Sequence, residues 1–276
     1  MTAPEAKRAR LRTLLLEMDS VAVAFSAGVD STFLLAAAQE ALGERAVAVT
    51  VRSAFVPPEE IRAAQAFCAS RGVRQIVLDA DVLAVDGVRE NPPERCYLCK
   101  RALFGQIRAA AAANGLRCVA EGSNVDDTAD YRPGMRAIRE LGVRSPLLEA
   151  GLTKAEIRTL SREMGLPTWD KPAMACLATR FPCGETITAA KLSQVAQAEA
   201  LLRDLGYRQL RVRVHGDLAR IELEDAHERE RLLVSHSAAV DQSLRALGFR
   251  YVSLDLGGYR TGNMNPENNK NGGTFL

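Results

Sequence analysis

The sequence lacks a long hydrophobic run and an excess of one charge. No apolar stretch approaches the roughly 20 residues that cross a membrane, and the first 16 residues lack the apolar centre of a signal peptide. We therefore expect a cytoplasmic protein with no membrane partner. The 36 basic and 34 acidic residues leave a net charge of +2, so no basic field predicts a nucleic-acid partner.

The sequence also lacks a Walker A motif, because Gly-x-x-x-x-Gly-Lys-Ser/Thr occurs nowhere in it. It has instead an apolar run at Val21–Phe25, a turn of small residues at 26–28 and an apolar helical pattern at Thr32–Leu42. Small residues let backbone N–H groups approach a phosphate, and a helix N-terminus adds about half a positive charge. The unit predicts a phosphate-binding loop. The alternative is an ordinary βα turn of a doubly wound sheet.

Polar side chains of the same stretch suit ATP, because hydroxyls donate to phosphate and Asp30 can hold a bridging magnesium ion. The stretch resembles the PP-loop, Ser-Gly-Gly-x-Asp-Ser, of the N-type ATP pyrophosphatases, which split ATP between the α and β phosphates and adenylate their substrates. Ala27 stands where that family usually has glycine, and alanine costs little at negative φ but more at positive φ. The expected ATP-binding residues are Ser26, Ala27, Gly28, Val29, Ser31, Thr32 and Gly122.

Strands and helices alternate through the first part of the chain. The apolar patterns predict strands at 21–25, 46–51, 75–78 and 118–120, and helices at 32–42, 58–71, 97–114 and 153–164. This alternation predicts an α/β fold with a parallel sheet covered on both faces. Ligands of such sheets bind at the carboxyl ends of the strands, where the loops 26–31 and 121–127 follow their strands.

The pattern changes after an irregular loop at 172–185. Helices are predicted at 189–205 and 225–247, and strands at 209–215, 218–223 and 251–254, which indicates a small α+β unit on an antiparallel sheet. We therefore expect a nucleotide-binding domain at 1–180, an α+β domain for substrate binding or oligomerisation at 181–262, and a flexible tail at 263–276.

Four of the six cysteines lie in predicted loops or at a helix start: Cys96, Cys99, Cys176 and Cys183. The Cys96-x-x-Cys99 pair opens a predicted helix, where thiolates are favoured. Such a pair occurs in redox sites, zinc sites and iron–sulfur sites. With Cys176 as a third thiolate, a 4Fe–4S cluster would keep one iron open. Cys183 could instead complete a four-thiolate site.

Several motifs together resemble the LarE family over nearly the whole chain. They are Ser-Ala-Gly-Val-Asp-Ser, Cys-Tyr-Leu-Cys-Lys, Glu-Gly-Ser-Asn-Val-Asp-Asp-Thr, Pro-Ala-Met-Ala-Cys-Leu-Ala-Thr-Arg and Gly-Tyr-Arg-Thr-Gly. LarE proteins are ATP-dependent sulfur transferases that build the nickel-pincer nucleotide cofactor of lactate racemase. The resemblance implies a PP-loop ATP pyrophosphatase domain. It also implies adenylation of the carboxylates of pyridinium-3,5-biscarboxylic acid mononucleotide and their conversion to thiocarboxylates.

The resemblance places Cys176 at the sulfur-donor position. Some family members sacrifice that cysteine, whereas others use three cysteines to hold a 4Fe–4S cluster whose bound sulfide is the donor. Cys96, Cys99 and Cys176 resemble the second type. The family also implies a homo-oligomer, such as a hexamer, and a supply of sulfide or a cysteine desulfurase.

Further site residues are expected in the second half of the chain. Arg211 and Arg213 alternate with apolar residues and face one side of a strand, which suits a phosphate. A solvated outer face would give the same pattern, but LarE proteins use a matching pair for the substrate phosphate. Arg180 is expected to stabilise negative charge on the substrate. Glu199 and Glu222 resemble family carboxylates that bind a divalent ion.

Other functions fit parts of the pattern. A PP-loop tRNA thiolation enzyme would also use a 4Fe–4S cluster, but it is expected to carry a basic surface or an RNA-binding module. Amide-forming enzymes such as NAD synthetase and GMP synthetase give no reason for three loop cysteines. A nucleotide-binding regulator would bind ATP without releasing pyrophosphate.

Overall fold

The structure is a computed structural model, and it describes residues 3–129, 133–260 and 262–264. The chain forms two compact units, one of residues 1–85 and 96–174 and one of residues 86–95 and 175–276. The expected ranges 1–180 and 181–262 stay a prediction. Most of the expected tail at 263–276 lies outside the described residues.

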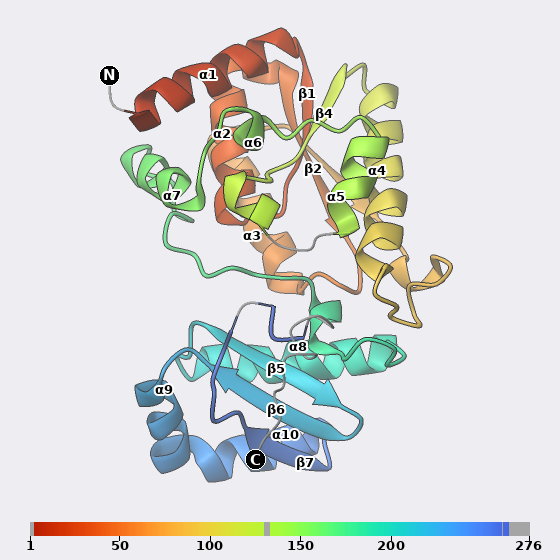
Figure 1. The fold of residues 1–276 in the computed structure, drawn as a ribbon, viewed down its shortest axis with the longest axis vertical. Coiled ribbons are helices and arrows are strands. Elements are labelled where there is room, and N and C mark those ends of the chain that lie inside the picture. Colours follow the sequence, from red (N-terminus) through yellow and green to blue (C-terminus); the bar gives the residue numbers. More distant parts are fainter. Residues whose placement is uncertain (1–2, 130–132, 261, 265–276) are drawn as a thin grey trace. The chain divides into compact units, whose positions relative to one another are not determined.

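The first unit is built on a parallel sheet, as the alternating pattern predicts (Figure 1). Its strands are β1 (Val21–Ala24), β2 (Ala46–Arg52), β3 (Gln75–Asp79) and β4 (Cys118–Ala120), in the order β3-β2-β1-β4. Val21 of β1 lies opposite Ala46 of β2 and Cys118 of β4. Because β2 and β4 lie on opposite sides of β1, the strand order reverses between β1 and β4, where α/β sheets bind ligands.

Helices cover both faces of this sheet. The core on one face includes Val21, Val23 and apolar residues of helices α1 (Ala3–Glu17), α2 (Val29–Leu42), α3 (Pro58–Arg71), α6 (Pro146–Glu149) and α7 (Lys154–Glu163). The other core joins Ala22 and Val49 to α4 (Arg95–Ala113) and α5 (Pro133–Glu140). Short 3₁₀ turns lie at η1 (Gly43–Arg45), η2 (Val82–Ala84) and η3 (Val125–Ala129).

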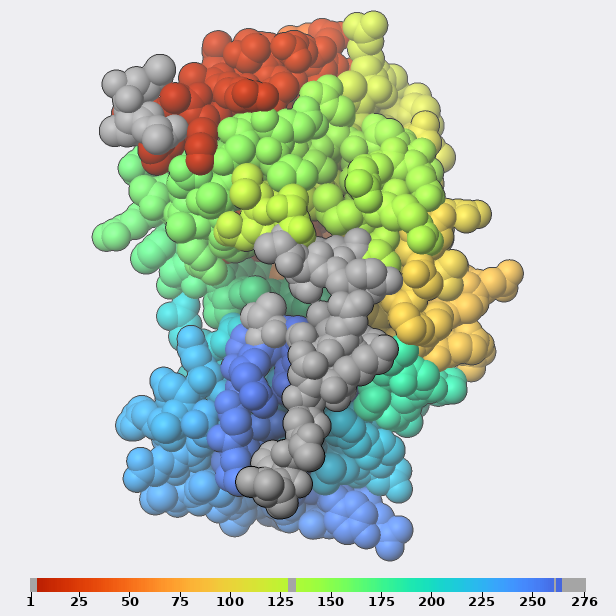
Figure 2. All heavy atoms as spheres, in the orientation of Figure 1, coloured from red at the N-terminus to blue at the C-terminus, as the bar shows by residue number. Residues whose placement is uncertain are grey.

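Helix α1 lies at the surface of this unit, where it is drawn in red (Figure 2). It packs on α2 through Leu11 and Leu15, which are fully buried. None of the helices among the described residues is long and apolar enough to cross a membrane.

The second unit contains a sheet in the order β5-β6-β7. Its elements are η4 (Leu177–Arg180), α8 (Ala189–Asp204), β5 (Leu210–His215), β6 (Leu218–Leu223), α9 (Ala226–Arg231), the π-helical turn η5 (Leu232–His236), α10 (Ser237–Ala246) and β7 (Tyr251–Leu254). Strands β5 and β6 are antiparallel, but β7 is parallel to β6. The expectation of a wholly antiparallel sheet was therefore wrong: α9, η5 and α10 cross over between β6 and β7, and a crossover makes parallel pairing possible.

Candidate functional site

The predicted phosphate-binding loop connects β1 to α2. Gly28 is the N-cap of α2, and its carbonyl accepts a hydrogen bond from the Thr32 N–H at 3.0 Å. The helix begins at Val29, three residues earlier than the apolar pattern indicated. Asp30 and Ser31 therefore belong to its first turn, where unpaired N–H groups and the helix dipole favour an anion.

Ala27 adopts a left-handed backbone conformation, with φ 54°. It is also buried, at 2% exposure. Gly28 has φ −81°, which any residue tolerates. Glycine would thus be favoured at position 27, where the chain carries alanine, and the loop holds this residue against its intrinsic preference.

Hydroxyl groups line the start of α2. The Oγ atoms of Ser26 and Ser31 lie 3.1 Å apart, and the Ser31 hydroxyl also donates to the Gly28 carbonyl at 3.3 Å. The buried Thr32 Oγ1 has no hydrogen-bond partner in the described part of the chain. Val29 is buried in the core and can offer a ligand only its backbone. The hydroxyls are thus gathered where the sequence placed them.

Asp30 lies between two side chains that the sequence reasoning missed. Its carboxylate pairs with the Lys154 ammonium from α7 and accepts a hydrogen bond from Asn124 Nδ2 at 3.3 Å. Asn124 belongs to the polar loop after β4, which was expected to meet the motif loop. Lys154 directly follows Thr153, the N-cap of its helix. A basic residue at the start of a predicted helix was therefore the sequence feature that could have pointed to it.

Gly122 brings the second loop against the first. A Cβ atom at this position would lie 3.1 Å from the Ser31 nitrogen and 3.3 Å from Asp30 Cβ. Only a glycine allows this approach without displacement of α2. Gly122 therefore lies beside Asp30 and Ser31, as its expected place in the ATP site requires.

A further lysine contacts the motif loop. The Lys171 ammonium donates to the Ala27 carbonyl at 3.0 Å and pairs with Glu60 at 2.7 Å. Its side chain is 22% exposed. Lys171 begins the Lys-Pro-Ala-Met-Ala-Cys segment, and its contact supports the strained residue of the loop.

Cys96 and Cys99 are the second and fifth residues of α4, so the pair opens this helix as predicted. Residues three apart share one face of a helix, so both thiols can be presented together. Between them, the hydroxyl of Tyr97 donates to Glu140 at 2.7 Å, and the guanidinium of Arg136 stacks 3.7 Å from the ring centroid. The Tyr97 ring thus already holds the Arg136 cation on one face.

All six cysteines are in the thiol form. Burial raises the pKa of Cys68 to about 11, so that thiol is unreactive. Cys96 and Cys99 belong to the first unit and Cys176 to the second. Within the described residues of either unit, no three His, Cys, Asp or Glu side chains are grouped to hold a metal ion.

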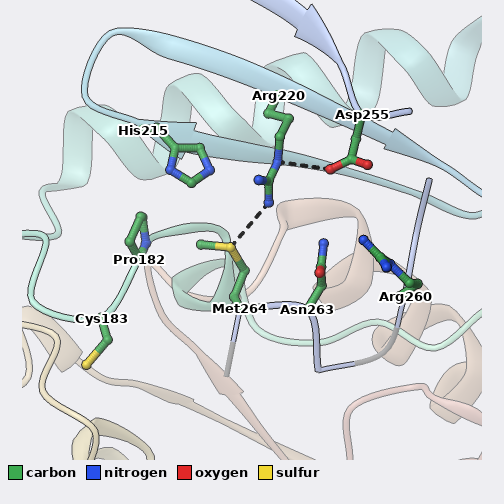
Figure 3. Close-up of a pocket in the computed structure, with 8 residues that line it drawn as sticks. All are labelled: Pro182, Cys183, His215, Arg220, Asp255, Arg260, Asn263 and Met264. Atoms are coloured by element: carbon green, nitrogen blue, oxygen red, sulfur yellow. Dashed lines mark hydrogen bonds and ion pairs between the residues drawn. The ribbon is translucent and has the colours of Figure 1, made fainter. Parts of the chain in front are cut away.

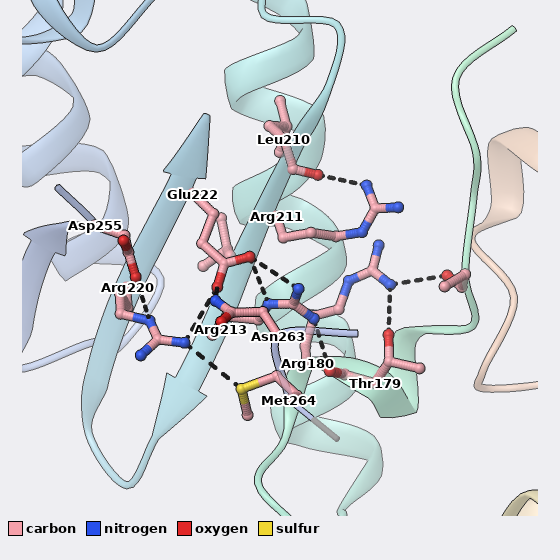
Figure 4. A network of polar contacts seen from close by, with 12 residues as sticks. Thr179, Arg180, Leu210, Arg211, Arg213, Arg220, Glu222, Asp255, Asn263 and Met264 are labelled. Carbon is pink, nitrogen blue, oxygen red and sulfur yellow. Dashed lines mark hydrogen bonds and ion pairs between the residues drawn. The ribbon is translucent and has the colours of Figure 1, made fainter. Parts of the chain in front are cut away.

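The second unit contains a network of buried arginines and glutamates (Figure 4). Arg180 is fully buried and bonds both oxygens of Glu199, at 2.8 and 2.9 Å. The Arg180 Nη1 atom donates to the carbonyls of Ala175 and Cys176, at 2.8 and 3.1 Å. Arg180 therefore fixes the backbone around Cys176, the expected sulfur-donor position.

Arg211 and Arg213 of β5 are also buried, at 3% and 4% exposure. The solvated outer face considered for these residues is therefore wrong. Arg213 Nε bonds Glu222 at 2.9 Å, and its Nη1 donates to the Thr179 carbonyl at 2.9 Å. The Arg211 guanidinium lies 4.9 Å from the ring centroid of Tyr259, a contact that the sequence did not reveal.

The charge of Arg180 shifts the pKa values of both Arg211 and Glu199 in this network. Burial and repulsion by Arg180 lower the pKa of Arg211 to about 10. Burial alone would raise the pKa of Glu199, but Arg180 outweighs burial and holds that pKa below its ordinary value. Because Arg211 is still positive at neutral pH, the cluster retains charge that can bind an anion.

Glu199 and Glu222 were expected to hold a divalent ion. Both are fully buried, and the structure engages them with arginines: Glu199 with Arg180, and Glu222 with Arg213 and Arg220. Their role with a metal stays a prediction. A cation would compete with guanidinium groups for the same oxygens.

The fold and the loop define an α/β protein with a PP-loop domain and a smaller second domain. No family model matches the chain. It is 40% identical over 260 residues to the pyridinium-3,5-bisthiocarboxylic acid mononucleotide synthase of Lactiplantibacillus plantarum, covering 94% of each chain. The chain therefore belongs to the LarE family, the family of that synthase.

Two other relatives extend the comparison. An uncharacterized protein of Synechocystis sp. is 42% identical over 261 residues, which cover 95% of this chain and 97% of the relative. The glutamine-hydrolysing GMP synthase of Aeropyrum pernix is 28% identical over 206 residues, 67% of this chain and 40% of its own.

Proposed function

We propose that the protein is an ATP-dependent sulfur transferase that acts on pyridinium-3,5-biscarboxylic acid mononucleotide. The observation that carries this is the convergence of Ser31, Asp30 and Gly122 at the reversal point of the sheet. The name of the Lactiplantibacillus plantarum relative gives the bisthiocarboxylate product, and the biscarboxylate is the substrate from which sulfur transfer would form it. The products beside the thiocarboxylate would be AMP and pyrophosphate.

Adenylation would take place at the PP-loop. Backbone N–H groups at 26–31 and the first turn of α2 would bind the phosphates, and Asp30 would hold Mg²⁺ against phosphate oxygens. The Asp30 carboxylate fits this role, because it supplies oxygen ligands at 23% side-chain exposure. Lys154, which now neutralises Asp30, would be freed to pair with phosphate when magnesium takes its place.

Sulfur delivery would involve the three cysteines. Sulfide would attack the acyl carbon of the adenylate to form a carbon–sulfur bond, its proton would pass to solvent, and AMP would leave with the electron pair of the broken carbon–oxygen bond. If Cys176 itself were the donor, its Sγ would attack and its Cβ–Sγ bond would then break by elimination, which releases the thiocarboxylate and leaves dehydroalanine. Arg211 and Arg213 would bind the substrate phosphate, and Arg180 would stabilise the developing negative charge. The second carboxylate would react in the same way.

Cys96, Cys99 and Cys176 are the residues that would hold a 4Fe–4S cluster. The support is the donor chemistry, three cysteine thiols of which two are three residues apart near the start of α4; the described residues of either unit do not by themselves group three such ligands. When bound, the cluster would supply an open iron that carries sulfide. Iron and acid-labile sulfide in anaerobically purified protein, and their loss in Cys176→Ala, would support it, whereas iron-free protein would refute it.

The adenylation step is tested by pyrophosphate release with ATP, magnesium and the dicarboxylate substrate. Asp30→Asn should lower the rate by at least about 100-fold, because it removes the metal ligand. The matched control is Asp79→Asn, an exposed carboxylate at the end of β3 in the same unit, which should leave the rate unchanged. Equal rates for wild type and Asp30→Asn would contradict the assignment.

A further inference from the structure

The short segment before α4 is part of the second unit. Residues 86–95 belong to this unit together with residues 175–276, although Arg95 is also the first residue of α4. A backbone hydrogen bond joins the segment to the chain that follows η4, because the Gly184 N–H donates to the Asn91 carbonyl at 2.8 Å. The segment therefore packs beside the turn that follows the expected sulfur-donor position.

Asn91 anchors this segment through both ends of its side-chain amide. The residue is 3% exposed and has φ 52°, a left-handed conformation that asparagine adopts more readily than most residues. Its Nδ2 donates to the Pro182 carbonyl at 2.7 Å, and its Oδ1 accepts from Arg95 at 2.7 Å. Pro182 in turn lines an open cavity of the second unit together with Cys183 (Figure 3). Asn91 thus fixes Arg95 relative to the chain after η4.

Arg95 carries a buried positive charge to η4. It is 8% exposed, and the Nη1 atom that binds Asn91 also donates to the Ala178 carbonyl at 2.7 Å. Ala178 lies in η4, two residues after Cys176, which is the N-cap of that turn. Within the second unit, Arg95 therefore holds the turn that begins at Cys176.

Carbonyl groups of residues 175–179 accept hydrogen bonds from three buried arginines. Arg180 and Arg213 bind three of these carbonyls (Figure 4), and Arg95 binds a fourth, that of Ala178. A hydrogen bond from a charged donor is roughly twice as strong as a neutral one. So many charged donors leave a short turn little freedom, and they fix the backbone that directs the Cys176 side chain.

We propose that Arg95 is a positioning residue for sulfur transfer, which it supports by holding η4 and, through η4, Cys176. The inference rests on the proposed function, because it presupposes that sulfur is delivered at Cys176. Displacement of a reacting group by about 1 Å can cost about 100-fold in rate, so a loosened η4 would slow the sulfur step. Adenylate would still form and would be hydrolysed by water, which returns the carboxylate and releases AMP.

Two substitutions at Arg95 separate this role from side-chain packing. Both hydrogen bonds come from the one nitrogen Nη1, so the ammonium of Arg95→Lys, with three donors, can keep them. Arg95→Met has an unbranched side chain but no donor. The matched control is Arg231→Met, since Arg231 donates to the Leu205 carbonyl at 3.0 Å in the same unit.

The test compares the sulfur incorporated with the pyrophosphate released in a single turnover of the anaerobic full chain supplied with sulfide. Wild type should incorporate one sulfur atom for each pyrophosphate. Arg95→Met should lower this ratio at least about tenfold through misplacement of the donor, whereas Arg95→Lys and Arg231→Met should keep it. An unchanged ratio in Arg95→Met would overturn this inference alone. Pyrophosphate without thiocarboxylate in the wild type would overturn the proposed function as well.

Hydrogen exchange provides a readout that needs neither substrate nor cluster. The Thr179 N–H donates to the Cys176 carbonyl at 3.0 Å, and the Phe181 N–H donates to the Ala178 carbonyl at 3.4 Å. Both amides should exchange about tenfold faster in Arg95→Met, because η4 loses a hydrogen bond from a charged group. Exchange at the wild-type rate would contradict the proposal.

Asn91→Gly keeps the proposal testable if Arg95→Met does not fold. Glycine suits the left-handed conformation of position 91, so this variant removes the amide that holds Arg95 without straining the backbone. It should lower the ratio of sulfur to pyrophosphate and speed exchange in η4, in the same directions as Arg95→Met. Wild-type values of both quantities in Asn91→Gly would overturn the positioning role.

Discussion

Among single residues, Ala27 departs most from what its type prefers. The sequence showed that alanine replaces the usual glycine of the PP-loop, but not the sign of φ, which depends on the whole loop. The observed φ of 54° is held by the contact from Lys171 to the Ala27 carbonyl and by burial. The loop therefore stores a small backbone strain.

Single substitutions at Ala27 and Gly28, the two small residues of the loop, separate the effect of backbone strain from the effect on phosphate binding. Ala27→Gly should change the free energy of unfolding by no more than about 1 kcal/mol, because relieved strain offsets the added chain entropy. Gly28→Ala should also fold normally, since its Cβ would make an ordinary contact, 3.5 Å from Ser26 Oγ. It should still weaken ATP binding if phosphate approaches this backbone.

Urea denaturation and ATP binding by calorimetry would measure the two effects in both variants. We expect Gly28→Ala to unfold at the same urea concentration as wild type and to bind ATP more weakly. Unchanged ATP affinity in Gly28→Ala would show that phosphate does not lie against position 28.

Among the elements, β5 shows that one alternating sequence pattern is compatible with two environments for its polar face, solvated or buried. Alternation placed Arg211 and Arg213 on one face, but alternation alone cannot tell a solvated face from a covered one. Glu222 from β6 pairs with Arg213, and Glu199 from α8 accepts the Val212 N–H and brings a compensating negative charge toward Arg211. Tertiary contacts of this kind are invisible to a local pattern. The four strands of the parallel sheet and helices α2, α3, α4 and α7, in contrast, were predicted closely because their signals are local, whereas α1, α5 and α6 were not predicted.

The buried pair between Glu199 and Arg180 predicts a large effect from a small change. Glu199→Gln leaves a buried guanidinium without its counter-charge and should cost about 3–5 kcal/mol in the free energy of unfolding. As a control, Asp241→Asn removes an exposed partner of Arg245 and should cost less than about 1 kcal/mol. Similar losses in the two variants would contradict the account of the network.

The same pair predicts a pH dependence. The folded pKa of Glu199 lies below its ordinary value of 4.5, so its stabilisation is complete above that pH. It is lost as pH falls through the folded pKa. The difference in unfolding free energy between wild type and Glu199→Gln should therefore be constant near neutrality and shrink in acid. A difference that grows in acid would show that the pKa is raised instead.

At the scale of the whole molecule, the chain combines a PP-loop unit with a smaller unit rich in buried arginine. The motifs predicted the family and the fold class, and both are confirmed by the relatives and by the sheet. Contacts such as Asp30 with Lys154 could not be predicted, because 124 residues separate them. The cysteines of the proposed sulfur chemistry likewise come from both units.

The most direct test of the central claim is the mass of the product. Anaerobic protein would be incubated with pyridinium-3,5-biscarboxylic acid mononucleotide, ATP, magnesium and sulfide, and the nucleotide analysed by mass spectrometry. The account predicts replacement of one oxygen by sulfur at each carboxylate, with one AMP and one pyrophosphate formed for each replacement. Pyrophosphate release without any sulfur in the nucleotide, or no reaction at all, would contradict it.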